Sequence, residues 1–373
     1  MADPLCCYFR KCGGCSAQHI NYSTQLENKK KLLINRIKYE DVKIFFDNNY
    51  NYRNRMDFIF HRNGLGLREK GKWYSIIDIE KCVISNEKLN LLLREIREFF
   101  NDCDYFDIRK KTGTFKYAVL RTPGDNSSIS FVLNENSTRL NEAIKKIKEF
   151  AKISCANNII VTYVPANSDI SISNNYFVVK GTEKLKETLL DSEFYYSIQG
   201  FFQNNTVMTN KMHEYIHKIL EKYKEDTLKS SLLDLYGGVG TFGIINAGLF
   251  KSVIIVENDK NCIDSVEENI KNNNVKNIKA IILDAKQLGR LKLKQPLFVI
   301  TDPPRSGMDE KTIIELKKLK PKVIIYISCN VDRLGKDIPK FKDYKIKSAA
   351  MFDLFPQTPH IEAVVEMELN TQS

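Results

Sequence analysis

The chain has 373 residues, of which 43% are hydrophobic and 28% are charged. This length allows two or three domains with hydrophobic cores, and the composition excludes a disordered or fibrous protein. The formal net charge of +11 indicates either a solvated basic surface or a polyanionic partner such as nucleic acid.

The first residues, MADPLCCYFRKC, contain no apolar segment and no small-residue cleavage site of a secretory signal. The longest apolar runs, such as VIIYI from Val323, are too short to span a bilayer. We therefore expect a cytoplasmic protein that does not bind a membrane, and we expect it to be a monomer. Nine cysteines in a reducing compartment indicate metal binding or catalysis rather than a disulfide framework.

The segment CCYFRKCGGCSAQH, which begins at Cys6, holds four cysteines within ten residues. Thiolates from such a short loop, with one more from a distant segment, can hold an iron–sulfur cluster or a zinc ion. The next segment, STQLENKKKLLINRIK, predicts a helix, because Ser23 or Thr24 can cap it and Leu and Ile recur at roughly helical spacing.

Residues from about 50 to 184 are predicted to form an α+β domain with mostly antiparallel strands. Segments rich in β-branched and aromatic residues are separated here by Gly, Asn, Asp or Pro. They are RNRMDFIFHR, TFKYAVLRT, SISFVLN, NIIVTYVP and YFVVKG. Two helical patterns, NEKLNLLLREIREFF and LNEAIKKIKEFAK, lie between them.

From about residue 194 onward, short apolar strands alternate with helices. This alternation predicts an α/β domain with a doubly wound, largely parallel sheet. The expected strands are SLLDLY, SVIIVE, IKAIIL, LFVITD, KVIIYIS, YKIKSAAMFD and AVVEMEL. Ligands bind beyond the carboxyl ends of the strands in such sheets, so the residues at these ends are candidate site residues.

The first of these strands leads into LLDLYGGVGTFG, where Gly238, Gly240 and Gly243 match the pattern G-x-G-x-x-G. Glycines allow the backbone to approach a ligand closely. Glu257 ends the next strand about twenty residues later, where an acidic group can bind ribose hydroxyls. Asp284 ends the third strand, at the usual place for an acceptor to an adenine amine. These features fit a dinucleotide or S-adenosylmethionine; the alternative is a tight turn followed by surface acids.

The next strand ends carry residues with chemistry of their own. Asp302-Pro-Pro is typical of methyltransferases that act on base nitrogens, although Arg305 stands where those enzymes have an aromatic residue. The following strand ends in Cys329, and FPQTPHIE brings His360 and Glu362 to the same edge. Methylation of a pyrimidine at C5 needs both a thiolate, which adds to C6 and makes C5 nucleophilic, and a base that removes the C5 proton. Considered separately, a buried Cys and a surface Glu would be ordinary features.

The combination of DPPRSG, VIIYISCN and FDLFPQTPHIE resembles the RNA (uracil-5-)-methyltransferases, which make 5-methyluridine in transfer or ribosomal RNA. The resemblance runs from Cys6 to the end of the chain. It implies methyl transfer from S-adenosylmethionine to C5 of a uridine in structured RNA, either tRNA or 23S rRNA, through a covalent Cys–C6 adduct. It assigns Cys329 as the nucleophile and Glu362 as the base. It assigns contacts with the methyl donor to Gln203, Tyr236, Thr241, Glu257, Asp284 and Asp302.

One branch of this family carries a [4Fe-4S] cluster in a β-rich domain that handles RNA. The resemblance maps its ligands to Cys6, Cys12, Cys15 and Cys82, with Cys7 as an alternative to Cys6. Basic side chains interleaved with aromatic ones suit contacts with an RNA backbone and stacking on its bases. Here they are Arg53, Arg55, His61, Arg62, Arg68 and Lys70; solvated strand faces are the alternative interpretation.

We therefore expect an iron–sulfur and RNA-binding domain at residues 1–18 and 50–190. A Rossmann-like methyltransferase domain is expected at residues 19–49 and 191–373, with a helix at residues 20–45 packed on it, as in relatives.

Three other functions fit part of the sequence. An iron–sulfur oxidoreductase with a nicotinamide cofactor would use the glycine loop, but it leaves Asp302, Cys329 and Glu362 unexplained. A methyltransferase acting on base amines would account for Asp302 and not for Cys329. An RNA-binding zinc protein would account only for the charge and the cysteines.

Overall fold

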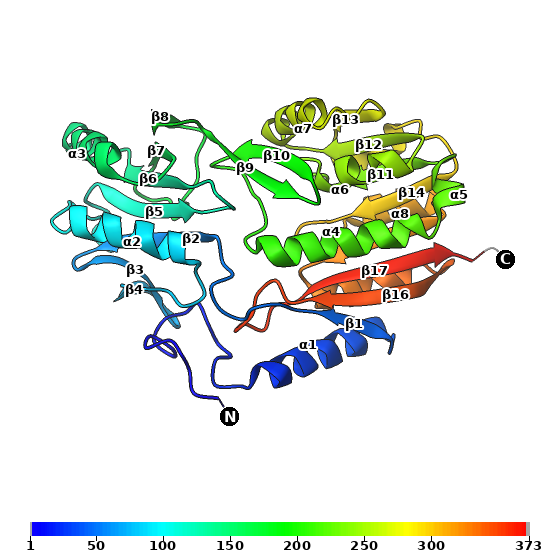
Figure 1. Cartoon of the computed structure of the whole chain (residues 1–373), viewed down its shortest axis with the longest axis horizontal. Coiled ribbons are helices and arrows are strands. Elements are labelled where there is room, and N and C mark those ends of the chain that lie inside the picture. The colour runs from blue at the N-terminus through cyan, green and yellow to red at the C-terminus, as the bar shows by residue number, and fades with distance from the viewer. Residues whose placement is uncertain (1, 371–373) are drawn as a thin grey trace. The chain divides into compact units, whose positions relative to one another are not determined.

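The computed structural model describes residues 2–370, and the chain forms two compact units (Figure 1). Unit 1 comprises Met1–Tyr22, Asn48–Glu187 and Ser197–Thr206, and unit 2 comprises Ser23–Asp47, Thr188–Tyr196 and Val207–Ser373. None of the helices between residues 2 and 370 combines the length and the hydropathy that crossing a bilayer requires.

Unit 1 is built on a seven-stranded sheet with the order β4-β3-β2-β5-β6-β7-β8. Neighbouring strands are antiparallel except β6 and β7, which run parallel because a helix between them returns the chain to the same end of the sheet. The strands are β2 (Arg55–His61), β3 (Gly64–Glu69), β4 (Lys72–Asp78), β5 (Phe115–Arg121), β6 (Ser128–Asn134), β7 (Asn158–Val164) and β8 (Tyr176–Lys180). The strands predicted in this region are all present.

The helices α2 (Glu87–Phe99) and α3 (Leu140–Ile153) pack on the same face of this sheet (Figure 1). Asn86 caps α2, because its side chain accepts a hydrogen bond of 2.8 Å from the backbone N of Leu89. The main core lies under both helices and includes the buried rings of Phe60, Phe100, Phe131 and Phe150. The opposite face carries a smaller apolar cluster of Tyr117, Val119, Val132 and Val164.

Unit 2 contains an eight-stranded sheet with the order β1-β16-β17-β15-β14-β11-β12-β13. Its strands are β1 (Val42–Phe45), β11 (Ser231–Leu235), β12 (Ser252–Glu257), β13 (Ile278–Ile282), β14 (Leu297–Thr301), β15 (Val323–Ser328), β16 (Tyr344–Phe352) and β17 (Glu362–Leu369). Every residue of β11, β14 and β15 is buried, as in a sheet that is covered on both faces. The predicted doubly wound, largely parallel sheet is confirmed, with β17 as an antiparallel strand between β15 and β16.

The remaining elements complete the two units. They are the hairpin strands β9 (Lys184–Leu189) and β10 (Ser192–Ser197) and the helices α4 (Thr206–Glu221), α5 (Lys224–Thr227), α6 (Thr241–Ile245), α7 (Lys260–Asn272), α8 (Glu310–Leu319) and α9 (Val331–Asp337). Short 3₁₀ turns lie at η1 (Ala247–Leu249), η2 (Ala285–Arg290) and η3 (Ile338–Lys340).

The N-terminal helix of unit 2 is shorter than the expected span of 20–45. Helix α1 (Tyr22–Ile37) ends where Lys38 adopts a φ of 56°, a left-handed conformation that stops a helix. The chain then forms β1, which pairs in parallel with β16 at the edge of the sheet. The expectation of a helix through residue 45 was therefore wrong, because pairing with a distant strand decides the structure of Val42–Phe45.

Helix α1 carries a buried cation toward the loop that precedes β17. Lys29 is 5% exposed, and its Nζ donates to Asp353 Oδ1 at 2.6 Å and to the carbonyl oxygen of Phe355 at 3.1 Å. Asp353 is fully buried. Gln25 Nε2 also donates to Gln357 Oε1 at 3.0 Å. Three hydrogen bonds from two side chains of one helix thus hold the segment that leads into Glu362.

We predict that Lys29→Met lowers the free energy of unfolding by about 3–5 kcal/mol, because it leaves the Asp353 carboxylate buried without its cation. The control is Arg36→Ala, which removes the exposed ion pair of the same helix with Asp332 and should change stability by less than about 1 kcal/mol. Chemical denaturation followed by circular dichroism measures both. Equal stability of the two variants would contradict the role given to the buried pair.

Candidate functional site

The candidate site of unit 2 lies where the strand order reverses, between β11 and β14. Strands β11 to β15 are parallel, so their carboxyl ends share one edge of the sheet. Strand β17 runs the other way and therefore begins at this edge. A crevice at such a reversal point is the usual ligand site of doubly wound sheets.

The loop after β11 has a backbone that few side chains allow. Gly238 and Gly240 have φ values of 52° and 89°, and Tyr236 has a φ of 62°. A Cβ atom on Gly237 would lie 2.4 Å from Ile255 Cγ2, so this glycine is required by close packing. Positive φ at a residue such as Tyr236 costs energy and is concentrated at functional sites.

Two carboxylates accept hydrogen bonds from the backbone of this glycine loop. Asp234 is buried, and its Oδ2 accepts a hydrogen bond of 2.8 Å from the backbone N of Gly243. Glu257 Oε2 accepts one of 3.0 Å from the backbone N of Gly238. Glu257 Oε1 already accepts from the backbone N of Asn258 at 2.7 Å and of Asp259 at 3.1 Å, so the remaining lone pair of Oε2 is the one that can accept from a ligand hydroxyl.

The adjacent strand ends add further acids. Asp284 lies after β13 and caps the turn that follows, accepting a hydrogen bond of 2.9 Å from the backbone N of Lys286. Asp302 follows β14, and burial raises the pKa of its carboxyl to about 7. Burial also raises the pKa of Asp234 to about 7, with smaller contributions from the charges of Asp302 and Glu257. This edge of the sheet is therefore crowded with carboxyl groups.

Cys329 and Glu362 face each other across neighbouring strands. Strand β15 pairs with β17 in a register that places Ser328 opposite Ala363. Cys329 is the next residue after β15, and Glu362 is the first residue of β17, so they occupy the next position of the same ladder. Glu362 is 3% exposed, and Cys329 is partly buried.

The surroundings of this pair oppose negative charge. The pKa of the Cys329 thiol is raised to about 11, mainly by burial and also by the carboxylates of Glu362 and Asp302, while Arg305 offsets part of this rise. Burial also raises the pKa of Glu362 well above its ordinary value, with a smaller contribution from Asp302. The thiol therefore needs help to ionise, and Arg305 is the cation that provides it.

Four of the cysteines in unit 1 line one small cavity: Cys6, Cys12, Cys15 and Cys82. Their thiols are close enough that each pair interacts electrostatically. Cys7 is exposed and does not line the cavity. Among the residues that the structure describes, no group of three or more His, Cys, Asp or Glu side chains is arranged to hold a metal ion.

The other predicted residues lie as follows. Thr241 begins α6 directly after the glycine loop. His360 has an exposed side chain, and the centroid of its ring lies 6.2 Å from the centroid of the Phe355 ring. Gln203 belongs to unit 1, in the irregular segment before α4, so its contact with the methyl donor stays a prediction.

Three residues of this site were not given a role in the sequence analysis. Asp234 supports the glycine loop, Arg305 lowers the pKa of the Cys329 thiol, and Lys29 holds the segment before Glu362. A charged residue inside the apolar run LLDLY was a usable signal for Asp234. No sequence pattern relates Lys29 to residues more than 300 positions away.

Comparison with known proteins gives one family and several relatives. The model of the tRNA (uracil-5-)-methyltransferase family matches residues 21–370. A tRNA (uracil(54)-C(5))-methyltransferase of Pyrococcus abyssi is 30% identical, over 98% of this chain and 85% of its own length. An RNA methyltransferase of Nanoarchaeum equitans, described as uncharacterized, is 32% identical over 98% of this chain and 80% of its own.

A solved structure has the same fold as this chain. It is the crystal structure of the P. abyssi tRNA (uracil-54, C5)-methyltransferase in complex with S-adenosyl-L-homocysteine. The TM-score is 0.79 with 28% sequence identity, and the match covers 95% of this chain and 85% of that one.

We predict that Glu362→Gln increases the alkylation rate of Cys329 by iodoacetamide at mildly alkaline pH, roughly threefold to tenfold. Removing the neighbouring carboxylate lowers the thiol pKa, so a larger fraction is thiolate at a given pH. Arg305→Ala should have the opposite effect, because it removes the cation that lowers this pKa. Mass spectrometry of the labelled peptides measures the rates.

Cys155 is the internal control for this experiment. Its thiol also has a pKa of about 11, raised by burial and by Glu95 rather than by Glu362. Its alkylation rate should be the same in all three proteins. An unchanged rate at Cys329 in Glu362→Gln would show that the carboxylate does not act on the thiol.

Proposed function

Since the chain belongs to the tRNA (uracil-5-)-methyltransferase family and is an S-adenosylmethionine-dependent RNA methyltransferase, we propose that it methylates C5 of a specific uridine in tRNA. The observation that carries this proposal is that Cys329 and Glu362 lie opposite one another on neighbouring strands, at the edge of the sheet that also carries the glycine loop. The expected α/β methyltransferase fold and the expected family are both confirmed.

The relatives favour tRNA over 23S rRNA as the substrate. The relatives from three Pyrococcus species are named for uracil 54 of tRNA, and each matches nearly the whole of this chain. We therefore propose a tRNA uridine, modified in the cytoplasm by a monomeric enzyme, and treat 23S rRNA as an alternative outcome of the test.

The reaction begins at Cys329. Its thiolate adds to C6 of the uracil ring, forming an S–C6 bond and moving the ring electrons toward C5 and O4 as an enolate. C5 then attacks the methyl group of the donor, whose sulfonium leaves as a neutral thioether, S-adenosylhomocysteine. Arg305 supports the first step, because its charge favours the thiolate.

Glu362 completes the reaction. It takes the proton that remains on C5, the C5=C6 bond reforms, and the Cys329 thiolate is expelled. One methyl group is gained and one proton is released in the whole cycle. The raised pKa of Glu362 makes it a stronger base than an exposed carboxylate, which suits the removal of a carbon-bound proton.

The methyl donor would bind at the edge of β11, β12 and β14. In this proposal Glu257 would accept from a ribose hydroxyl and Asp284 from the adenine amine, while Tyr236, Thr241 and Asp302 would lie around the donor at the glycine loop. Gln203 is proposed as a further contact on the grounds of the family resemblance.

The test is a methylation assay with donor carrying a labelled methyl group, on unmodified tRNA transcripts and on 23S rRNA fragments. We expect label in tRNA, at one uridine, as 5-methyluridine, and none with Cys329→Ala. Cys262→Ala is the matched control, because Cys262 is another half-buried thiol of unit 2 with a raised pKa and lies outside the pair. Label only in 23S rRNA would overturn the tRNA assignment, and label on a base nitrogen would overturn the reaction.

We also propose that Cys6, Cys12, Cys15 and Cys82 hold a [4Fe-4S] cluster in unit 1. The donor set in the cavity fits this group, since it consists of thiols without imidazole or carboxylate. Burial raises the pKa of Cys6, Cys12 and Cys15, so these thiols ionise readily only beside a cation. Each thiolate of such a cluster binds a different iron, so the thiols need not converge on one point as around zinc. We propose Cys6 and not Cys7 as the ligand, because only Cys6 lines the cavity.

The scaffold around these thiols is fixed by hydrogen bonds. Buried Asn90 accepts from the backbone N of Cys82 at 2.8 Å and donates to its carbonyl oxygen at 3.0 Å. The backbone N of Cys6 donates to Gln18 Oε1 at 3.0 Å. Since the methyl transfer involves no net oxidation or reduction, we assign the cluster a structural role in unit 1.

We predict that protein purified without oxygen is brown and contains about four irons per chain. Cys12→Ser and Cys82→Ser should each lose the iron and the visible absorption. Cys103→Ser should keep both, because Cys103 is a partly buried thiol of the same unit that does not line the cavity. Metal analysis and absorption spectra measure this; stoichiometric zinc without iron would contradict the cluster.

A further inference from the structure

A pocket of about 640 Å³ lies in unit 1, away from the cysteine cavity. It opens on the sheet face that carries Ile59 and Tyr117, the face opposite to α2 and α3. Its walls come from the β3–β4 hairpin, from the loop at residues 105–111 and from the loop at residues 166–169. Its volume is within the range of small-molecule sites.

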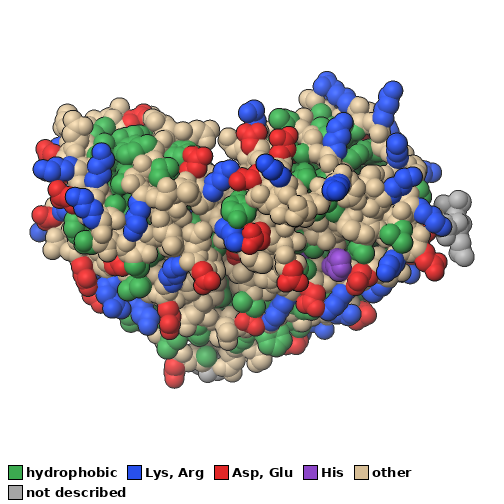
Figure 2. All heavy atoms as spheres, turned by 45° about the horizontal axis from the view of Figure 1, so that its top comes forward, with side chains coloured by type: hydrophobic (Ala, Val, Ile, Leu, Met, Phe, Trp, Pro, Cys, Tyr) green, Lys and Arg blue, Asp and Glu red, His purple; other side chains and the backbone are tan. Residues whose placement is uncertain are grey.

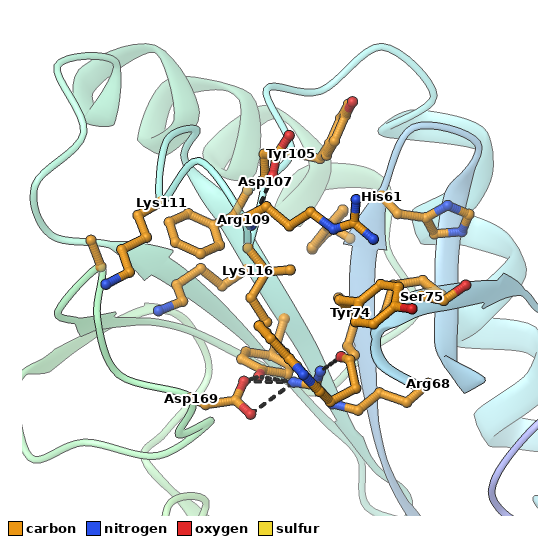
Figure 3. Close-up of a pocket in the computed structure, with 18 of the residues that line it drawn as sticks. His61, Arg68, Tyr74, Ser75, Tyr105, Asp107, Arg109, Lys111, Lys116 and Asp169 are labelled. Carbon is orange, nitrogen blue, oxygen red and sulfur yellow. Dashed lines mark hydrogen bonds and ion pairs between the residues drawn. The ribbon is translucent and has the colours of Figure 1, made fainter. Parts of the chain in front are cut away.

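Aromatic rings on the hairpin are unusually exposed. Trp73 is 61% exposed and Tyr74 is 41% exposed. Their rings are perpendicular, with centroids 5.8 Å apart, and the guanidinium carbon of Arg109 lies 4.3 Å from the centroid of the Tyr74 ring. Figure 3 shows the Arg109 side chain extending over Tyr74 inside the pocket. Exposed aromatic rings and guanidinium planes are the surfaces on which unpaired bases stack.

The pocket is also positively charged. Its cationic side chains are Arg62, Arg68, Arg109, Lys111 and Lys116, and its carboxylates are Asp107 and Asp169. Both carboxylates are already used within unit 1. Asp107 Oδ1 accepts from the backbone N of Arg109 at 2.9 Å and of Lys110 at 3.0 Å, and Asp169 pairs with Arg68 (Figure 3).

Some of these cations are held by contacts within unit 1, and others are exposed and can bind a ligand. Lys116 is buried, and its Nζ donates to the carbonyl oxygens of Pro165 and Ser168, which holds the loop at residues 166–169. Arg62, Arg109 and Lys111 are exposed and make no ion pair within residues 2–370. Figure 2 shows Lys and Arg side chains scattered among Asp and Glu over the face that it draws. The positive net charge of the chain therefore does not by itself mark a binding site. In this pocket, however, five Lys and Arg side chains lie together with only two carboxylates.

We propose that this pocket binds an unpaired nucleotide of the substrate RNA, other than the uridine that is methylated. The proposal rests on the proposed function for the identity of the RNA. The base stacks on Trp73 or on the Arg109 guanidinium that covers Tyr74, and Arg62 and Lys111 contact the flanking phosphates. A base-paired helix keeps its bases stacked inside, so the exposed rings are suited to a loop or a single strand.

The residues that form this pocket were only partly foreseen. Of the six basic residues expected to contact RNA, three line it: His61, Arg62 and Arg68. Arg55 instead pairs with Asp57 at 3.1 Å, and Arg53 Nε donates to the carbonyl oxygen of Arg55 at 2.8 Å.

Trp73 is the only tryptophan of the chain, so its fluorescence reports on this pocket without a label. Titration of the full chain with an unmodified tRNA transcript should quench this fluorescence in a saturable way. A single-stranded oligonucleotide should also quench it, and polyglutamate of similar charge should not. Equal quenching by polyglutamate would overturn the RNA assignment in favour of an acidic peptide.

Variants then test the contacts. Tyr74→Ala and Arg109→Ala should weaken tRNA binding roughly 5- to 150-fold, the range for loss of one stacked base, and raise KM more than they lower kcat. Arg62→Ala should reduce the slope of log affinity against log salt by about 0.7, the value for one phosphate contact of a single strand. Lys148→Ala, an exposed cation on α3 at the opposite face, should change neither.

This experiment separates the two proposals. If the enzyme methylates tRNA while Trp73 is not quenched and Tyr74→Ala and Arg109→Ala keep the wild-type KM, the pocket proposal is overturned and the function stands. If tRNA quenches Trp73 and these variants bind it more weakly although no 5-methyluridine forms, the pocket proposal is supported and the proposed reaction fails.

Discussion

The antiparallel pairing of β15 with β17 is the contact on which the proposed chemistry depends. Five parallel strands bring their carboxyl ends to one edge, but a parallel strand delivers only the residue that follows it. Because β17 runs the other way, its first residue, Glu362, reaches the same edge from the opposite direction. The proposed base is thus held beside the proposed nucleophile by a ladder of backbone hydrogen bonds and not by a flexible loop.

Several carboxyl groups and the Cys329 thiol are buried at the same edge of the sheet, where burial disfavours their negative charge. Asp234, Asp302 and Glu362 all have raised pKa values because of burial, and the Cys329 thiol is raised by the same cause. A sulfonium donor carries positive charge into this region, so the acids that disfavour a thiolate in the free protein favour the donor. The same positive charge favours the Cys329 thiolate, so binding of the donor and ionisation of the thiol should support one another.

Much of unit 2 could be predicted from the sequence, because short apolar runs that alternate with helices define a parallel sheet. The chemistry-bearing residues then follow from where each run stops: Glu257, Asp284, Asp302 and Cys329 all stand at strand ends. The direction of β17 could not be read from AVVEMEL, since the pattern of a buried strand is the same in either direction. The edge strand β1 was missed because four residues, VKIF, carry too little periodicity.

Unit 1 was predictable in its elements and not in its surfaces. The core strands and both helices follow from their apolar patterns, whereas the pocket is made by three loops that are far apart in the sequence. Trp73, Arg109 and Asp169 come together only because the sheet order places β3, β5 and β7 near one another. A single exposed tryptophan gives no periodic signal, and its neighbours are defined by long-range packing.

The measurement that tests the central claim most directly is a search for the covalent intermediate in Glu362→Gln. This variant keeps the shape of the side chain and loses the base, so Cys329 should add to C6 and C5 should accept the methyl group, after which the C5 proton blocks release. With tRNA and labelled donor, we expect a protein–RNA complex that survives a denaturing gel and carries the label. Cys329→Ala should give no such complex. Turnover of Glu362→Gln at the wild-type rate, or methylation by Cys329→Ala, would contradict the account.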